Sequence, residues 1–147
     1  LGISLGSRIA VDLAVRYPQR VKDLILASVL ARRVVEKRMS LPLRLSFVLR
    51  TIPGLRPQYR QPWHAFVKQH AAAIDYDSVA QSARISVPTL ILHGKRDITA
   101  AYRGAAEINR AIAGSRLVSF EGGHSFFRTD EQRAFFREVF ESAQIPQ

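Results

Sequence analysis

A serine, an aspartate and a histidine in this chain could together carry out acyl-transfer chemistry. Gly2, Ser4 and Gly6 form the pattern G-x-S-x-G, Asp97 follows the apolar run TLILHG, and His124 lies in the stretch EGGHS. Serine is a weak nucleophile until a base takes its proton, and the base works best when an acid holds its ring in one tautomer. The three residue types therefore predict a nucleophile, an orienting acid and a base, in that order along the chain.

The G-x-S-x-G pattern is informative only together with the residues after it, since a chain of this length shows the pattern by chance roughly one time in twenty. A catalytic serine needs a tight turn from strand to helix that lifts its hydroxyl clear of the sheet, and the crowding in such a turn favours glycine. A helical pattern starts directly after Ser4. The free backbone amides at a helix start, with that of Leu5 first, could hold a developing oxyanion.

Apolar strands and one-sided helices alternate along most of the chain. The first helix is predicted from Gly6 to Tyr17, with Ile9, Leu13 and Tyr17 on one face and Pro18 as its end. The other predicted elements are strands at 21–28, 87–94 and 116–120, a helix around Ala105, Ile108 and Ile112 that ends at Gly114, and a last helix capped by Thr129 and Gln132 ahead of Phe135, Phe136, Val139 and Phe140. The alternation indicates an α/β fold with a parallel sheet.

Parallel strands present their carboxyl ends at one edge of the sheet, and ligands of open α/β folds bind there. Asp97 and His124 each follow a predicted strand, and Ser4 stands at the turn that would join a strand to the first helix. We therefore expect the three side chains to converge at that edge.

The stretch from about Val29 to Arg84 interrupts the alternation. It shows no strand, and it carries predicted helices at 41–52 and 63–74 together with eight of the chain's basic residues between Arg32 and Arg60. The net charge of +10 would suit nucleic acid or an anionic membrane. No nucleic-acid motif accompanies the basic residues, so a solvated face is the favoured interpretation.

The segments GISLGSRIAVDLAVRYPQRV, VPTLILHGKRD and EGGHSFF, in the chain order Ser, Asp, His, resemble the C-terminal portion of the α/β-hydrolase fold from the nucleophile elbow onward. The resemblance covers the chain from end to end. It implies a partial fold in which residues 1–28 and 85–147 belong to the hydrolase core and residues 29–84 form a helical lid. Ser7 departs from the family, because many members have glycine there.

The resemblance also implies that the first half of the fold is missing, including the loop that gives the second oxyanion-hole amide. We therefore expect the isolated chain to be inactive. For the complete protein the resemblance implies a serine hydrolase acting on a carboxylic ester, lactone or thioester through Ser4, Asp97 and His124, with Leu5 in the oxyanion hole. A non-catalytic binding protein of the same fold and an acyltransferase on the same triad are the alternatives.

The expected partner is a small molecule with an apolar acyl or ring portion, because the predicted helix at 41–52 is apolar. The sequence contains no cysteine, no spacing typical of a metal site and no run long enough to span a membrane. We expect no cofactor, no metal and no nucleic acid, and the sequence predicts no oligomeric state.

Each of these side chains also has an ordinary structural interpretation. Ser4 could cap the first helix, and Asp97 could cap the helix beyond it. The remaining polar and aromatic candidates are interpreted as structural: His93 as part of the core, Asp75 and Asp77 as caps or solvated residues, His64 and His70 as too widely spaced for a metal pair, and Trp63, Phe66 and Tyr76 as packing within the lid.

Overall fold

The computed structural model describes residues 1–31, 65, 68, 76–125, 133–134 and 137. The chain divides into two compact units, one made of residues 1–32 and 77–147 and the other of residues 33–76. Several predictions lie outside the described residues: the helix at 41–52, most of the helix at 63–74, most of the last helix, the basic residues between 32 and 60, and His64, His70, Asp75, Trp63 and Phe66.

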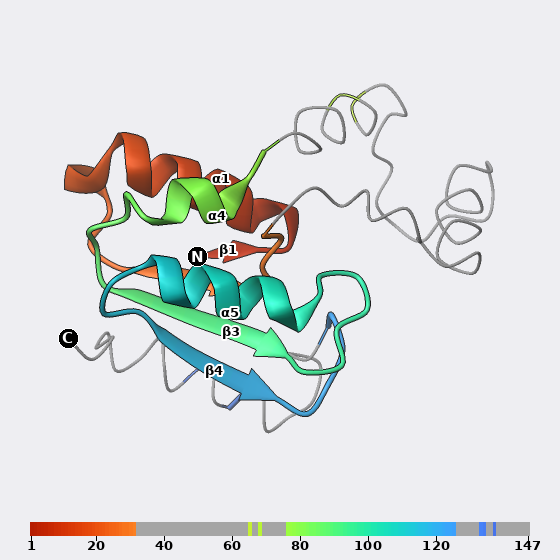
Figure 1. Ribbon diagram of the computed structural model, residues 1–147. Coiled ribbons are helices and arrows are strands. Elements are labelled where there is room, and N and C mark those ends of the chain that lie inside the picture. Colours follow the sequence, from red (N-terminus) through yellow and green to blue (C-terminus); the bar gives the residue numbers. More distant parts are fainter. Residues whose placement is uncertain (32–64, 66–67, 69–75, 126–132, 135–136, 138–147) are drawn as a thin grey trace. The chain divides into compact units, whose positions relative to one another are not determined.

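The described part of the first unit is built on a four-stranded parallel sheet (Figure 1). Its strands lie in the order β1 (Gly2–Ile3), β2 (Leu24–Ala27), β3 (Thr89–Gly94) and β4 (Arg116–Phe120). Every neighbouring pair is parallel. The predicted α/β class is confirmed, and all four strands deliver the following loops to one edge.

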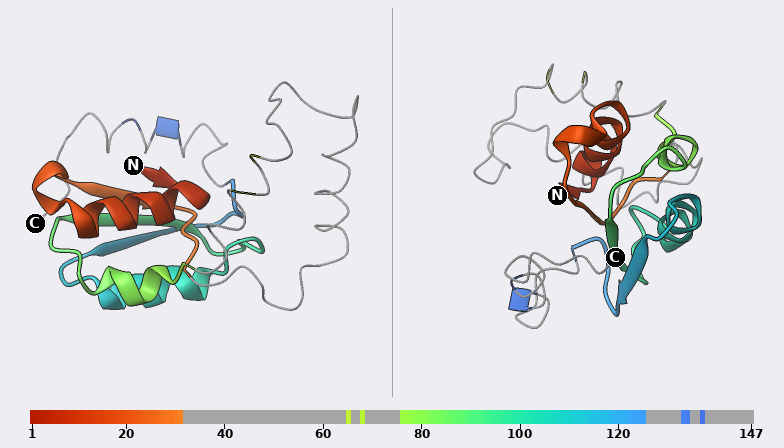
Figure 2. Two further views of the ribbon diagram at one scale, coloured as in Figure 1. Left: turned by 90° about the horizontal axis from the view of Figure 1, so that it is seen from above. Right: turned by 90° about the vertical axis from the view of Figure 1, so that its left-hand side faces the viewer.

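Among the described residues, three helices lie in the connections between these strands: α1 (Leu5–Arg16), α4 (Ser78–Ser82) and α5 (Tyr102–Ala111). A short 3₁₀ turn at Pro18–Arg20 ends the first connection. The three helices lie in a row on the same side of the sheet, with α4 between α1 and α5 (Figures 1 and 2). A helix between consecutive strands is the usual connection in a parallel sheet, because the chain must return to the other end of the sheet before the next strand.

The strands β2 and β3 are buried along their whole length. Alternate residues of the two strands pack together in one apolar cluster, with Val118 and Phe120 of β4 against it: Ile25, Ala27, Leu90 and Leu92. This period of two is the side-chain alternation of a strand. The central strands are therefore a rigid base for the loops that follow them.

Helix α1 does not bury the face that its largest apolar residues suggest. Ile9, Leu13 and Tyr17 are all exposed. The buried positions are instead Ser7, Arg8, Val11 and Ala14. Three of these four side chains are small, and the fourth, Arg8, donates from Nε to the carbonyl of Leu30 at 3.3 Å.

Helix α4 has no counterpart among the predicted elements. It spans five residues, which is too short for a hydrophobic period to be recognised. Asp77 caps it by accepting hydrogen bonds from the amides of Val79 and Ala80 at 2.9 and 3.2 Å. Capping was one of the two roles expected of Asp77, and it is the one observed.

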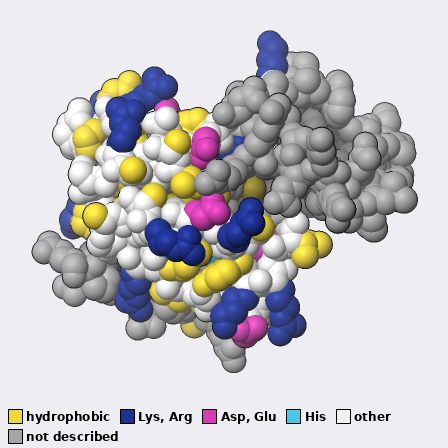
Figure 3. Space-filling model, in the orientation of Figure 1, with side chains coloured by type: hydrophobic (Ala, Val, Ile, Leu, Met, Phe, Trp, Pro, Cys, Tyr) yellow, Lys and Arg dark blue, Asp and Glu magenta, His cyan; other side chains and the backbone are white. Residues whose placement is uncertain are grey.

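Basic side chains in the described part are dispersed among acidic, apolar and neutral ones on the face seen in Figure 3. Two of them, Lys95 and Arg96, pair with Glu121. None of the helices in the described ranges is both long and apolar enough to cross a membrane.

Candidate active site

Ser4 occupies a strained turn between β1 and α1. Its φ of 52° and ψ of −119° are unusual for a residue with a side chain, and its amide donates to the carbonyl of Ala27 at 2.9 Å. A Cβ at Gly2 would overlap Gly6 and Ala10, whereas a Cβ at Gly6 would meet nothing within 4 Å. The turn therefore requires the first glycine of the motif sterically. Ser4 makes no capping hydrogen bond to α1, so its hydroxyl is directed elsewhere.

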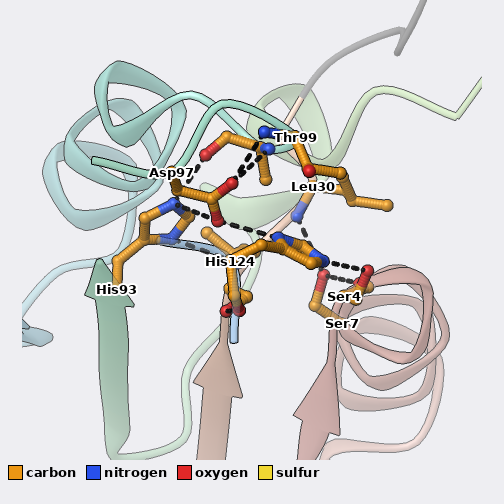
Figure 4. Close-up of polar contacts among 10 residues, drawn as sticks. Ser4, Ser7, Leu30, His93, Asp97, Thr99 and His124 are labelled. Carbon is orange, nitrogen blue, oxygen red and sulfur yellow. Dashed lines mark hydrogen bonds and ion pairs between the residues drawn. The ribbon is translucent and has the colours of Figure 1, made fainter. Parts of the chain in front are cut away.

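His124, which follows β4, links Ser4 after β1 to Asp97 after β3 (Figure 4). Its Nε2 lies 2.9 Å from Ser4 Oγ, and its Nδ1 lies 2.8 Å from Asp97 Oδ2. An ionised carboxylate can only accept, so Nδ1 carries the proton and Nε2 accepts the hydrogen bond that the serine hydroxyl donates. The His124 side chain is 26% exposed and the Asp97 side chain is fully buried.

Asp97 is held as a carboxylate by several donors at once. Its Oδ1 accepts from the amides of Thr99 and Ala100, both at 2.8 Å. Burial alone would raise its pKa, but the hydrogen bond from His124, the amides of Ala100 and Thr99 and the charge of His124 outweigh burial and hold the pKa below its usual value. Asp97 thus orders the following loop and faces His124. It does not cap the helix beyond that loop, α5, whose N-cap is Ala101.

His93 lies on the other side of the same carboxylate, fully buried at the end of β3. Its Nδ1 accepts from the amide of Val29 at 3.2 Å, so its Nε2 carries the proton and donates to the carbonyl of Ala100 at 2.8 Å. This Nε2 also lies 3.4 Å from Asp97 Oδ2. Burial lowers the pKa of His93, an effect only partly offset by the Ala100 carbonyl and Asp97, so the ring is neutral. Both ring nitrogens are engaged, as the core interpretation of His93 predicts.

Two buried serines that sequence reasoning did not select also belong to this arrangement. Ser7 Oγ donates to the carbonyl of Ser4 at 2.6 Å and accepts from the amide of Leu30 at 3.1 Å (Figure 4). Ser28 Oγ donates to the main-chain carbonyl of His124 at 2.6 Å. The position of Ser28 could have indicated its role, since it is the first polar residue after an apolar strand and stands at the edge of the sheet that carries the site.

The loops that carry Asp97 and His124 are joined to each other beside the site. The amides of Lys95 and Arg96 donate to the carbonyls of Phe120 and Gly122, each at 2.9 Å. Lys95 Nζ lies 2.6 Å from Glu121, and this pair lowers the pKa of Glu121. Gly94 permits the approach, because a Cβ there would overlap the carbonyl oxygens of Gly122 and Gly123.

The arrangement can activate a serine hydroxyl for attack on an acyl carbon. Leu5 is the first residue of α1, and helix geometry leaves its amide without an acceptor inside the helix. That amide and the positive end of the helix dipole are suited to a developing negative charge. Within the described ranges, no group of three or more His, Cys, Asp or Glu side chains is placed to hold a metal ion.

The chain is similar in sequence to a bacterial relative. It is 32% identical over 105 residues to the AB hydrolase superfamily protein YisY of Bacillus subtilis strain 168. The match covers 71% of this chain and 37% of the relative, so the chain spans well under half of that protein's length. None of the protein-family models matches this chain.

Solved structures with the same fold extend the similarity to nearly the whole chain. A hydrolase from Pseudomonas aeruginosa PA01 superimposes with a TM-score of 0.66 at 27% identity, covering 97% of this chain and 61% of the hydrolase. The esterase EaEST from Exiguobacterium antarcticum superimposes with a TM-score of 0.66 at 24% identity, covering 97% of this chain and 64% of the esterase. With its parallel sheet, strand-end site and sequence similarity, the chain belongs to the α/β-hydrolase superfamily.

Proposed function

We propose that the protein in which this sequence occurs is a serine hydrolase that cleaves carboxylic esters, with lactones and thioesters in the same chemical class. The observation that carries the proposal is the position of His124, whose two ring nitrogens lie within hydrogen-bonding distance of Ser4 and Asp97. A buried carboxylate, an imidazole and a serine in series are the arrangement that nucleophilic acyl chemistry needs.

In the proposed reaction, Ser4 Oγ attacks the acyl carbon while His124 Nε2 takes the hydroxyl proton. Asp97 keeps the imidazole in the tautomer with the proton on Nδ1 and stabilises the imidazolium that forms. The oxyanion lies against the Leu5 amide. His124 then protonates the leaving alcohol, and water, deprotonated by the same imidazole, attacks the acyl-enzyme and releases the acid.

One solved structure with the fold of this chain is an esterase, from Exiguobacterium antarcticum, and this supports the proposal of an ester substrate. Because the nucleophile position holds serine and not aspartate, acyl chemistry fits the site better than attack on an alkyl carbon. We further propose that the lid expected at residues 29–84 is supplied by the second compact unit, residues 33–76, and that the apolar sequence at 41–52 favours a hydrophobic acyl or ring portion in the substrate.

The test is hydrolysis of nitrophenyl esters of increasing acyl length by the intact protein in which this sequence occurs. We expect release of nitrophenol with a preference for chains longer than acetyl, and a loss of at least about 10³-fold in kcat in Ser4→Ala. Ser82→Ala is the matched control, because this buried hydroxyl donates only within α4, to the carbonyl of Ser78. Hydrolysis at the wild-type rate by Ser4→Ala would contradict the assignment of the nucleophile.

A further inference from the structure

We propose that Ser28 is a positioning residue that sets the place of His124 relative to Ser4 and Asp97. This inference rests on the proposed function, because it concerns the base of that same site. Its starting observation is the 2.6 Å hydrogen bond from Ser28 Oγ to the main-chain carbonyl of His124, which joins residues 96 positions apart. Ser28 is completely buried, so water does not compete for this hydroxyl.

The backbone of Ser28 is itself held in place. Its amide donates to the carbonyl of Leu92 in β3 at 2.9 Å, and the carbonyl of the preceding residue, Ala27, accepts from the Ser4 amide at 2.9 Å. Ser28 therefore stands between the strand that leads to the nucleophile and the strand that leads to the acid. A hydroxyl fixed to both of these strands is a suitable reference point for the base.

The conformation of Ser28 points to the same role. Its φ is 47°, and the other described residue besides glycine with a positive φ is Ser4 itself. This left-handed conformation is costly for a residue with a Cβ, and such strain concentrates at functional sites. Here it accompanies a side chain that contacts the segment carrying the base.

His124 needs this support because its own segment follows β4 as a turn outside the sheet. The backbone hydrogen bonds that join this turn to the acid loop end at Phe120 and Gly122. Among the described residues, the Ser28 hydroxyl is the partner of the His124 carbonyl itself. A small shift of the imidazole would lengthen both of its hydrogen bonds at once, and a misplacement of about 1 Å can cost roughly 10²-fold in rate.

Two variants separate the hydroxyl from the backbone strain. Ser28→Gly removes the hydroxyl and accepts the positive φ freely, whereas Ser28→Ala removes the hydroxyl and keeps the Cβ. If the hydroxyl positions the base, both variants lose activity alike. Ser82→Ala is the matched control, because Ser82 is equally buried and its hydroxyl also donates at 2.6 Å, but to Ser78 within α4.

The experiment measures kcat and KM for a nitrophenyl ester with the intact protein, together with the nuclear magnetic resonance signal of the His124 Nδ1 proton. We expect both Ser28 variants to lose about 10- to 100-fold in kcat with KM changed by less than about twofold. The Nδ1 proton signal should weaken or shift, because the hydrogen bond to Asp97 is no longer held. Ser82→Ala should retain the wild-type kcat and the wild-type signal.

Wild-type kcat and an unchanged Nδ1 signal in Ser28→Gly would overturn the positioning role. A loss of kcat equal to that of Ser82→Ala would also overturn it, since the effect would then be a general loss of stability. If neither Ser28→Gly nor Ser28→Ala folds, Ser28→Cys replaces them, because its thiol is a weak donor of similar volume. The kcat of Ser28→Cys should lie between that of the wild type and zero. A wild-type kcat in Ser28→Cys would contradict the positioning role. If the wild type hydrolyses no ester, the proposed function fails, and the Nδ1 signal still decides the role of Ser28.

Discussion

At the scale of single residues, Asp97 shows how much one carboxylate can do. One oxygen orders the loop after β3 through two amides, and the other faces His124 at 2.8 Å and His93 at 3.4 Å. Because every neighbour of the buried group is a donor, the charged form is favoured and the pKa stays low. The same residue therefore shapes the site and sets its electrostatics.

The substitution Asp97→Asn should reduce kcat by about 10³- to 10⁴-fold without unfolding the protein. The asparagine oxygen can still accept from the amides of Thr99 and Ala100, so its amide group turns toward His124. A donor facing Nδ1 forces the ring proton onto Nε2, and the ring can no longer accept the proton of Ser4. Ester hydrolysis by the variant measures the loss of kcat, and circular dichroism shows whether the variant is folded.

Asp77→Asn is the matched control for this prediction. Asp77 caps α4 through two amides in the same way that Asp97 orders its loop, and both of its hydrogen bonds lie within α4, away from the candidate site. Its variant should keep the wild-type kcat. Equal losses in the two variants would show that loop order, and not the tautomer of His124, accounts for the effect.

At the scale of elements, the segment that leaves β2 connects the parts of the site. Ser28 holds the carbonyl of His124, the Val29 amide donates to His93, and the Leu30 amide donates to Ser7. The Leu30 carbonyl accepts from Ser78 at 2.9 Å, which adds α4 to the same network. All of residues 28–31 are buried, so one stretch of backbone couples the strands of the nucleophile, the acid and the base.

Glycine substitutions test how closely these elements must approach. Gly94→Ala should lower the free energy of unfolding by about 1–3 kcal/mol, because the new methyl group would overlap the carbonyl oxygens of Gly122 and Gly123. The overlap would also push the loop of His124 away from the acid loop. Chemical denaturation gives the loss of stability, and ester hydrolysis should fall with it.

Gly6→Ala is the control at this scale. Gly6 lies in α1, and a Cβ there meets nothing within 4 Å, so the variant should be as stable as wild type or more stable by up to about 1 kcal/mol. A loss of stability in Gly6→Ala together with wild-type stability in Gly94→Ala would contradict the packing assigned to these two glycines.

At the scale of the whole molecule, a neutral histidine in the core makes stability depend on pH. The folded-state pKa of His93 is lowered from the ordinary value of 6.5, chiefly by burial. Below that value the unfolded chain binds a proton that the folded chain excludes, so stability is lost as pH falls from 6.5 through the lowered pKa. Asp97, whose pKa is lowered from 3.8, adds its own loss only at more acidic pH.

We therefore expect the free energy of unfolding to fall as the pH is lowered below 6.5, and His93→Gln to lose part of this dependence. The groups that face His93 are Asp97, His124 and Tyr102, whose ring centroid lies 6.0 Å away. Urea unfolding at closely spaced pH values gives the slope for each protein. An identical slope in His93→Gln would assign the dependence to another group.

The sequence predicted the strands and the chain order of the three candidate residues because local patterns determine both. Apolar runs predicted β2, β3 and β4, and Asp97 and His124 follow two of these strands, whereas Ser4 was recognised by its glycine-flanked turn before a helix. The contacts of Ser7 with Leu30 and of Ser28 with His124 could not be predicted, since these partners lie 23 and 96 residues away. The buried face of α1 could not be predicted from side-chain size either, because the large residues Ile9 and Leu13 are exposed whereas Val11 and Ala14 are buried.

The central claim is that His124 activates Ser4, and covalent labelling by a fluorophosphonate tests it most directly. The intact protein should be labelled at Ser4, as mapped by mass spectrometry, and the rate should fall by at least about 10³-fold in His124→Ala. Such a result requires the imidazole and the hydroxyl to act as one unit. Labelling at Ser4 that is equally fast without His124, or no labelling of a folded protein, would contradict the claim.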